Sequence, residues 1–234
     1  MADLLDPQYD YTNPKKVGRG CWYVLLVITA SVPQDETLRY FICKQIRNIT
    51  YTYFKCLECR NHSASYLIAN PPEDRMNEDG GLFNYVIDFM NDINKRLIRP
   101  LYDRNVLYQI FHSDNIRKEY TATLYDFAQY ERIERGCWYG LLVMTATCPK
   151  TKELIQFVCK QIRQILYADA KCQELRTFSK PYLVSFPPED RINEVDGLFN
   201  YLTDLIDPPD RKILYKIFHE EDYIRCYKGC EAHH

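Results

Sequence analysis

Hydrophobic residues in the first hundred positions follow helical spacing in four successive stretches. RGCWYVLLVITASVP (19–33) is apolar on all sides and ends at a proline, which is typical of a buried helix. A second helix is predicted from about Thr37 to residue 49, and a third over KCLECRNHSASYL (55–67), ended by Pro71-Pro72. Gly80-Gly81 opens an amphipathic fourth helix that stops before Pro100. Four helices with short connections predict a helical bundle.

The same pattern starts again at Arg135. RGCWYGLLVMTATCP repeats the first helix, and PPEDRINEVDGLFNY repeats PPEDRMNEDGGLFNY. From Trp22/Trp138 to Tyr85/Tyr201 the two copies stay 116 positions apart without a gap. The later motifs LYQIFH and LYKIFH are only 107 apart, so the second copy has lost nine residues from its fourth helix. The chain therefore holds two copies of one domain.

These patterns predict an all-α fold of two tandem four/five-helix bundle domains, packed on each other as a pseudo-dimer. We expect an extended N-terminal arm at 1–17, the first repeat at 18–112, an ordered connector at 113–133, the second repeat at 134–219 and a tail at 220–234.

Composition narrows the function classes. Of the 234 residues 46% are hydrophobic, which is enough to build real cores. A net charge of −2 and a pI near 6.2 give no electrostatic reason to bind nucleic acid or an anionic membrane. The longest apolar run is short, near 24–28, and the N-terminus lacks the features of a signal peptide. We expect an intracellular protein without membrane insertion.

Ten cysteines are more than a typical intracellular chain needs, yet too few for a disulfide-stapled scaffold of this length. Redox chemistry or metal binding explains this number of cysteines better than a scaffold of disulfides does. Four of the ten, Cys21, Cys43, Cys137 and Cys159, recur at equivalent positions in apolar surroundings. Those four are predicted to be small core residues.

The pair Cys56-Leu-Glu-Cys59 is the main candidate for chemistry. At the start of a helix, the helix dipole and free backbone N–H groups lower the pKa of a thiol and favour a reactive thiolate. Only the first copy keeps both cysteines, because the second has Cys172 and Leu175 at these positions. This asymmetry is expected when one copy performs chemistry and the other is a packing partner.

Other interpretations stay open. The pair can be two buried thiols, or part of a zinc site with His62 and Cys43. At the C-terminus, Cys226 and Cys230 in RCYKGC belong to neither repeat; they suit a mobile shuttle disulfide, and an inert tail is the alternative.

The first copy resembles the Erv/ALR-type FAD-linked sulfhydryl oxidases. The match consists of the opening Gly18-Arg19-Gly20-Cys21-Trp22, the Cys56/Cys59 pair, and Asn91-Asp92-Ile93-Asn94 followed by Lys95-Arg96-Leu97. It covers 18–103 well and 134–219 as a decayed copy. A tandem of one redox-bearing and one degenerate copy also looks like the pseudo-dimeric members of this family, including those of large insect DNA viruses.

The resemblance implies an FAD cofactor and roles for individual residues. Trp22 would stack near the flavin, Asn91 and Asn94 would line its pocket, and Arg19 and Arg96 would contact its phosphates or adenine side. Cys59 would be the thiol next to the flavin. Cys56 would exchange with the thiols of a protein substrate, so that electrons pass from substrate to the pair, to FAD and to oxygen.

The departures from the family pattern favour a second hypothesis. Leu26 and Met90 occupy positions where the family has flavin-contacting histidines, and neither can donate a hydrogen bond. The alternative is a non-catalytic, flavin-free descendant that acts as a structural or interaction protein, with homodimer or virion contacts as its partners, as a component of a large DNA virus particle.

Overall fold

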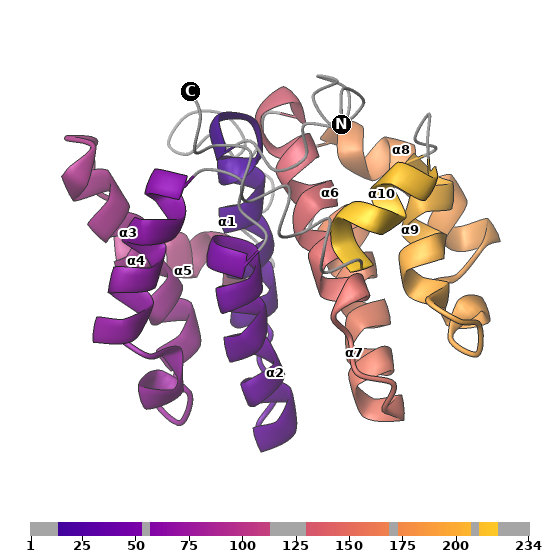
Figure 1. Cartoon of the computed structure of the whole chain (residues 1–234), viewed down its shortest axis with the longest axis horizontal. Coiled ribbons are helices and arrows are strands. Elements are labelled where there is room, and N and C mark those ends of the chain that lie inside the picture. Colours follow the sequence, from indigo (N-terminus) through magenta and orange to yellow (C-terminus); the bar gives the residue numbers. More distant parts are fainter. Residues whose placement is uncertain (1–13, 53–56, 113–129, 169–172, 207–210, 220–234) are drawn as a thin grey trace.

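The computed structural model describes residues 14–52, 57–112, 130–168, 173–206 and 211–219, and these ranges contain helices and no strand. The predicted all-α fold is confirmed (Figure 1). The first half contains α1 (Pro14–Ala30), α2 (Glu36–Arg47), η3 (Asn48–Thr52), α3 (Leu57–Ala69), η4 (Pro72–Arg75), α4 (Gly81–Arg96) and α5 (Arg104–His112). The second half contains α6 (Tyr130–Ala146), α7 (Lys152–Arg163), η7 (Gln164–Ala168), α8 (Gln173–Ser185), η8 (Pro188–Arg191), α9 (Gly197–Ile206) and α10 (Arg211–His219).

The predicted helices are present, with ends that differ by about two residues at Arg47 and Ala69 and by more at the starts of α1 and α6. Helix α1 begins at Pro14, so residues 14–17 are helical and the expectation of an extended arm is wrong for them. Proline suits this place, because the first helical residue needs no N–H partner and its fixed φ matches the helix. Helix α6 begins at Tyr130, so the last four residues of the predicted connector belong to a helix. The rest of the connector, 113–129, lies outside the described residues.

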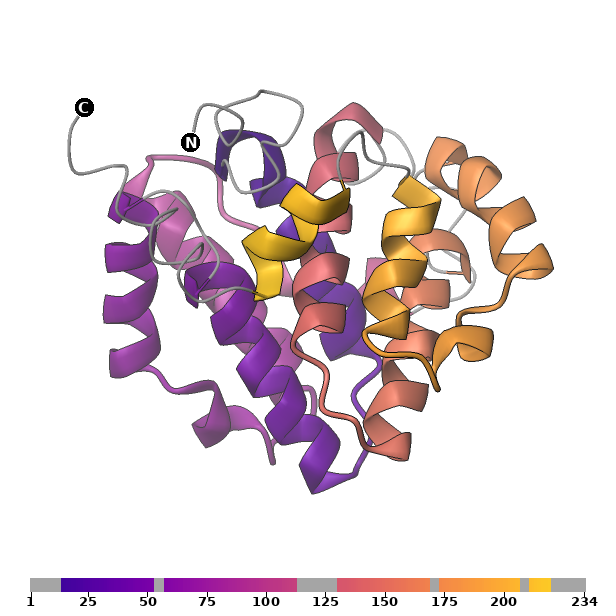
Figure 2. The ribbon, with the colours of Figure 1, turned by 45° about the vertical axis from the view of Figure 1, so that its right-hand side comes forward.

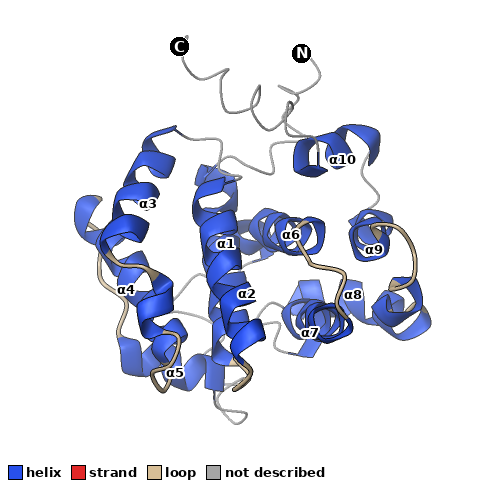
Figure 3. Ribbon diagram, turned by 60° about the horizontal axis from the view of Figure 1, so that its bottom comes forward, coloured by secondary structure: helices blue, strands red, loops and turns tan. Residues whose placement is uncertain are grey.

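Helices α1 and α6 lie side by side in the middle of the molecule, with the other helices of each half on either side (Figures 1 and 3). Figure 2 shows the same division from a second direction. The two central helices cross at Gly20 and Gly136: a Cβ added to Gly20 would lie 2.6 Å from the Cα of Gly136. Only glycine permits this backbone approach.

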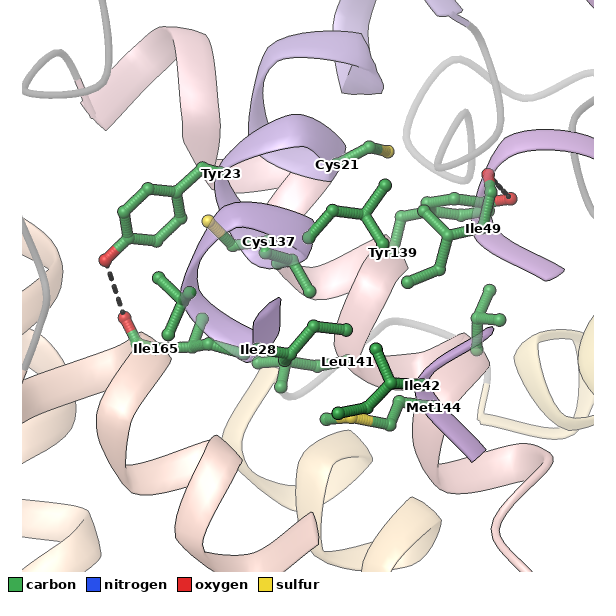
Figure 4. Packing of buried hydrophobic residues seen from close by; sticks show 14 of the residues in the cluster. Cys21, Tyr23, Ile28, Ile42, Ile49, Cys137, Tyr139, Leu141, Met144 and Ile165 are labelled. Atoms are coloured by element: carbon green, nitrogen blue, oxygen red, sulfur yellow. Dashed lines mark hydrogen bonds between the residues drawn. The ribbon is translucent and has the colours of Figure 1, made fainter. Parts of the chain in front are cut away.

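Contacts between the halves come in reciprocal pairs. The hydroxyl of Tyr23 donates to the carbonyl of Ile165 at 3.4 Å, and the hydroxyl of Tyr139 donates to the carbonyl of Ile49 at 3.1 Å (Figure 4). Both tyrosines are fully buried, so each hydroxyl needs such an acceptor. In each bond the tyrosine of one half meets the π-helical turn, η7 or η3, that follows the second helix of the other half. The core is therefore continuous across α1 and α6.

None of the helices in the described ranges is both long enough and apolar enough to span a bilayer.

Candidate functional site

Cys59 lies in the first turn of α3 and is half-buried. Helix α3 is 13 residues long, and its first turn carries the unsatisfied N–H groups and the positive end of the helix dipole. Its predicted partner Cys56 lies outside the described residues, as do the predicted shuttle cysteines Cys226 and Cys230. The roles of all four cysteines stay predictions.

One ion pair and one histidine–carboxylate contact join the first two turns of α3 to the end of α4. Arg96 Nη1 lies 2.7 Å from Glu58 Oε1, and His62 Nε2 lies 3.0 Å from Asp92 Oδ2. The His62 contact joins charges only when the imidazole is protonated, and its ring N–H is not aligned as a hydrogen bond requires. Glu58 and His62 are four residues apart on α3, and Asp92 and Arg96 are four apart on α4, so each set shares one helix face. Cys59 lies between these two contacts in sequence.

The same interface continues with aromatic contacts away from Cys59. The ring of Tyr66 stacks on Phe89 with centroids 4.3 Å apart and planes within 4° of parallel. One turn further, the hydroxyl of Tyr85 donates to the carbonyl of Asn70 at 2.7 Å. Four successive contacts therefore hold α3 antiparallel to α4 and fix the position of the turn that carries Cys59.

Among its described residues, the second half keeps the end of this interface that lies far from the position of Cys59. Tyr201 donates to the carbonyl of Phe186 at 2.8 Å, as Tyr85 does in the first half. At the position of His62 stands Phe178, whose side chain is 54% exposed, and α9 ends at Ile206. The charged contacts beside Cys59 thus have no equivalent among the described residues of the half that lacks the cysteine pair.

Asn91 and Asn94 hold the loop between α4 and α5. The side chain of Asn91 accepts from the backbone N–H of Tyr102 at 2.7 Å and donates to the Tyr102 carbonyl at 3.0 Å. Asn94 donates to the carbonyl of Pro100 at 3.1 Å. These amides, assigned above to a flavin pocket by resemblance, are used here to shape a loop. The sequence motif was ambiguous, because an asparagine side chain uses the same amide groups to bind the protein backbone and to bind a ligand.

The remaining residues of the implied flavin site are packed against protein. Leu26 and Met90 are 0% and 2% exposed and belong to the hydrophobic core. Trp22 is partly buried, and its ring meets Phe89 edge-on at 5.4 Å, while Tyr66 covers a face of Phe89. Arg19 is exposed on α1.

The described residues therefore do not fit a flavin at the positions that the resemblance implies. The expected donors are apolar, the amides hold a loop, Arg96 is paired with Glu58, and a protein ring is stacked on Phe89 beside Trp22. A cavity of about 480 Å³ lies elsewhere, near the C-terminal end of α1; its lining includes Thr29, Arg39, Gly81 and His112 and none of the site residues predicted above.

The four repeated cysteines are buried, which confirms their prediction as core residues. Burial raises the pKa of Cys43 and of Cys159 to about 12, and raises that of Cys21 as well. These thiols stay protonated and unreactive at neutral pH. Within the ranges that the structure describes, no group of three or more His, Cys, Asp or Glu residues is arranged to hold a metal ion. Cys43, one ligand of the alternative zinc site, is a core residue.

Alkaline pH is expected to destabilise the fold. An unfolded cysteine loses its proton near pH 9, whereas Cys43 and Cys159 keep theirs until about pH 12 in the folded protein. Between these values the folded state binds more protons, so stability is complete below about pH 9 and falls as pH rises toward 12. Urea midpoints should therefore fall steadily above pH 9. The double variant Cys43→Ala/Cys159→Ala should show a shallower decline, and an unchanged slope would contradict this assignment.

Sequence reasoning missed the contacts that surround Cys59. The 58/62 and 92/96 spacings on two predicted helices were the available signal, but their pairing requires knowing that α3 and α4 are antiparallel neighbours. Arg60, which follows Cys59, is 7% exposed and places a buried cation beside the thiol in sequence. Nothing in the local pattern distinguished it from a surface arginine.

Comparison with known proteins gives one match. Residues 19–115 match the model of the Erv1 / Alr family, which agrees with the resemblance drawn from the motifs of the first copy. No curated protein and no solved structure gave a significant match to the chain.

Proposed function

We propose that this chain, whose first half is similar to the Erv1 / Alr family, oxidises protein thiols by disulfide exchange at Cys56 and Cys59. The observation that carries the proposal is the placement of Cys59 in the first turn of α3, between two contacts to α4 that have no equivalent among the described residues of the second half. A half-buried cysteine in the first turn of a helix suits a reactive thiol, because the helix N-terminus favours the thiolate.

The exchange conserves atoms and electrons. A thiolate of the substrate attacks the Cys56 sulfur of a Cys56–Cys59 disulfide, so that the bond between the two cysteines breaks and Cys59 leaves as a thiolate. The second substrate thiolate then attacks the mixed disulfide, which releases Cys56 and leaves a disulfide in the substrate. Two electrons pass to the pair, and the two protons pass to solvent and the released thiolates. His62 lies one helical turn after Cys59 on α3, with its Nε2 3.0 Å from Asp92 Oδ2.

A second candidate is the FAD-linked sulfhydryl oxidase that uses oxygen as acceptor. The family match favours it, because residues 19–115 include Trp22, the cysteine pair and both asparagines. The packing of Leu26, Met90 and Tyr66 favours the flavin-free form. In the proposed thiol oxidation by disulfide exchange, the two halves form a pseudo-dimer in which the second half is a packing partner of the first.

One experiment separates these functions. We expect the purified full chain to show no flavin absorption and to release no FAD on denaturation. The oxidised chain should convert one equivalent of a reduced dithiol peptide to its disulfide, and turn over when oxidised glutathione is supplied. Flavin release together with oxygen consumption would replace this proposal with the FAD-linked oxidase. Absence of any disulfide transfer would support the non-catalytic alternative.

A further inference from the structure

Seven consecutive residues, 95–101, are exposed at the end of α4 and in the loop that follows it. We call them the 95–101 segment. Ile98 is 95% exposed, and Leu101 and Leu97 are 51% and 41% exposed. Three cations alternate with these apolar residues: Lys95, Arg96 and Arg99. Side chains of both kinds are thus presented on one short stretch of surface.

The backbone of the 95–101 segment is held in an unfavourable conformation. Ile98 has a φ of 53°, in the left-handed region where glycine is favoured and a β-branched residue is strained. The backbone N–H of Ile98 donates to the carbonyl of Lys95 at 3.2 Å, and that of Arg99 donates to the carbonyl of Asn94 at 2.8 Å. This is the pattern of a helix C-cap that usually contains glycine. Since the Ile98 side chain is almost fully exposed, packing does not offset this strain. Such residues are concentrated at functional sites.

The 95–101 segment adjoins the turn that carries Cys59. Arg96 contacts Glu58 at 2.7 Å, and the preceding residue of α3, Leu57, is 46% exposed. The exposed apolar side chains therefore come from both sides of the Arg96–Glu58 contact. A polypeptide bound along them would pass close to Cys59.

The internal repeat provides a control for this assignment. From the start of its fourth helix to the start of its fifth, the second half is nine residues shorter than the first. Most of this difference is in the helix itself, because α9 has 10 residues and ends at Ile206 whereas α4 has 16 and continues to Arg96. The half without the cysteine pair thus has no room for an equivalent segment. A loop needed only to connect two helices of this bundle would not require the extra length.

We propose that the 95–101 segment, together with Leu57, docks an extended, acidic stretch of the substrate protein in which apolar residues flank the reacting cysteine. The positive charge of the segment favours an acidic partner. Neither Lys95 nor Arg99 forms an ion pair within the described part of the chain, and both are close in sequence to the exposed apolar side chains. This proposal rests on the proposed thiol oxidation and names the chemistry of its substrate.

Binding is tested without redox chemistry. The probe is a fluorescein-labelled peptide in which glutamate and leucine residues surround a serine in place of the cysteine, and fluorescence anisotropy gives its affinity for the full chain. The triple variant Leu97→Ser/Ile98→Ser/Leu101→Ser should weaken binding roughly tenfold or more. Lys95→Glu/Arg99→Glu should also weaken it, and more strongly at low salt. The matched control Ile68→Ser removes a side chain that is 81% exposed on α3 and should bind as the unaltered chain does.

A variant that folds more stably shows whether weaker peptide binding results only from unfolding. Ile98→Gly relieves the backbone strain, so it should unfold at a higher temperature while binding the peptide less tightly. No binding by the unaltered chain, or equal binding by the triple variant, would overturn the docking proposal. So would segment-dependent binding to phosphatidylserine vesicles without peptide binding. Disulfide transfer that persists in these cases leaves the proposed function intact, whereas peptide binding without disulfide transfer rejects the proposed function alone.

Discussion

Replacing Cys59 by serine should reduce dithiol oxidation by the full chain to the uncatalysed background, a loss of about 100-fold or more. The physical reason is that the exchange needs both sulfur atoms. Without Cys59 no internal disulfide exists to accept electrons, and Cys56 can form only a mixed disulfide. The rate of peptide disulfide formation, followed by mass spectrometry in the presence of oxidised glutathione, measures the effect.

The two cysteines should differ in the adducts they form. In Cys59→Ser the remaining Cys56 should accumulate a stable mixed disulfide with the peptide, because no neighbouring thiol resolves it. In Cys56→Ser the half-buried Cys59 should form this adduct much more slowly. Equal trapping by both variants would refute the assignment of Cys56 as the exchanging thiol.

Cys148→Ser is the matched control. Cys148 is also half-buried but lies outside the pair, and burial raises the pKa of its thiol to about 12. Its replacement should leave dithiol oxidation unchanged. A comparable loss in Cys148→Ser would mean that the assay reports general damage to the fold and not exchange at Cys59.

Helices and repeat were predictable from sequence because they depend on local spacing. The apolar pattern and the prolines located most helix ends, and the constant offset between the repeated motifs defined both copies. The start of α1 at Pro14 was missed, because residues 14–17 include two lysines and a proline and resemble an extended arm. Val17 is the only apolar residue of these four, and a single apolar position shows no helical periodicity.

The candidate site was predictable only in part. Cys59 was selected as a candidate from its spacing to Cys56, and its role stays a prediction. What Asn91 and Asn94 do depends on which groups lie within reach of their side chains. Their partners, the backbone of Tyr102 and of Pro100, are determined by the course of a loop. The left-handed Ile98 is likewise a product of that loop, and neither an isoleucine nor its sequence neighbours indicate such a conformation. Contacts that depend on the course of a loop can be determined only from the structure.

The interface between the halves shows how one repeated sequence can pack on itself. Gln161 donates to the hydroxyl of Ser31 at 3.2 Å, and Thr147 donates to the side-chain carbonyl of Gln45 at 3.2 Å, again at equivalent positions. The equivalence is broken where Val24 in the first half corresponds to Gly140 in the second. A Cβ added to Gly140 would lie 3.0 Å from the side chain of Val24, so the glycine makes room for the valine.

Replacing Gly20 by alanine should therefore cause the largest loss of stability of the single substitutions considered. The added Cβ would meet the carbonyl oxygen of Ile133 and lie 2.6 Å from both the amide nitrogen of Cys137 and the Cα of Gly136. These are backbone atoms of a buried helix, so α1 and α6 must separate and loosen the core around them. We expect a cost of about 3 kcal/mol or more, and a similar cost for Gly136→Ala.

Three glycines form a graded series that tests this explanation. Gly18, two residues before Gly20 on the same helix, has nothing within 4 Å of an added Cβ, so Gly18→Ala should be neutral or stabilise by up to about 1 kcal/mol through helix propensity. Gly140→Ala should fall between them, because the neighbour it meets is a side chain. Urea unfolding of the full chain measures the order. If Gly20→Ala were no worse than Gly18→Ala, the close crossing of α1 and α6 would be wrong, and with it the continuous core that joins the two halves.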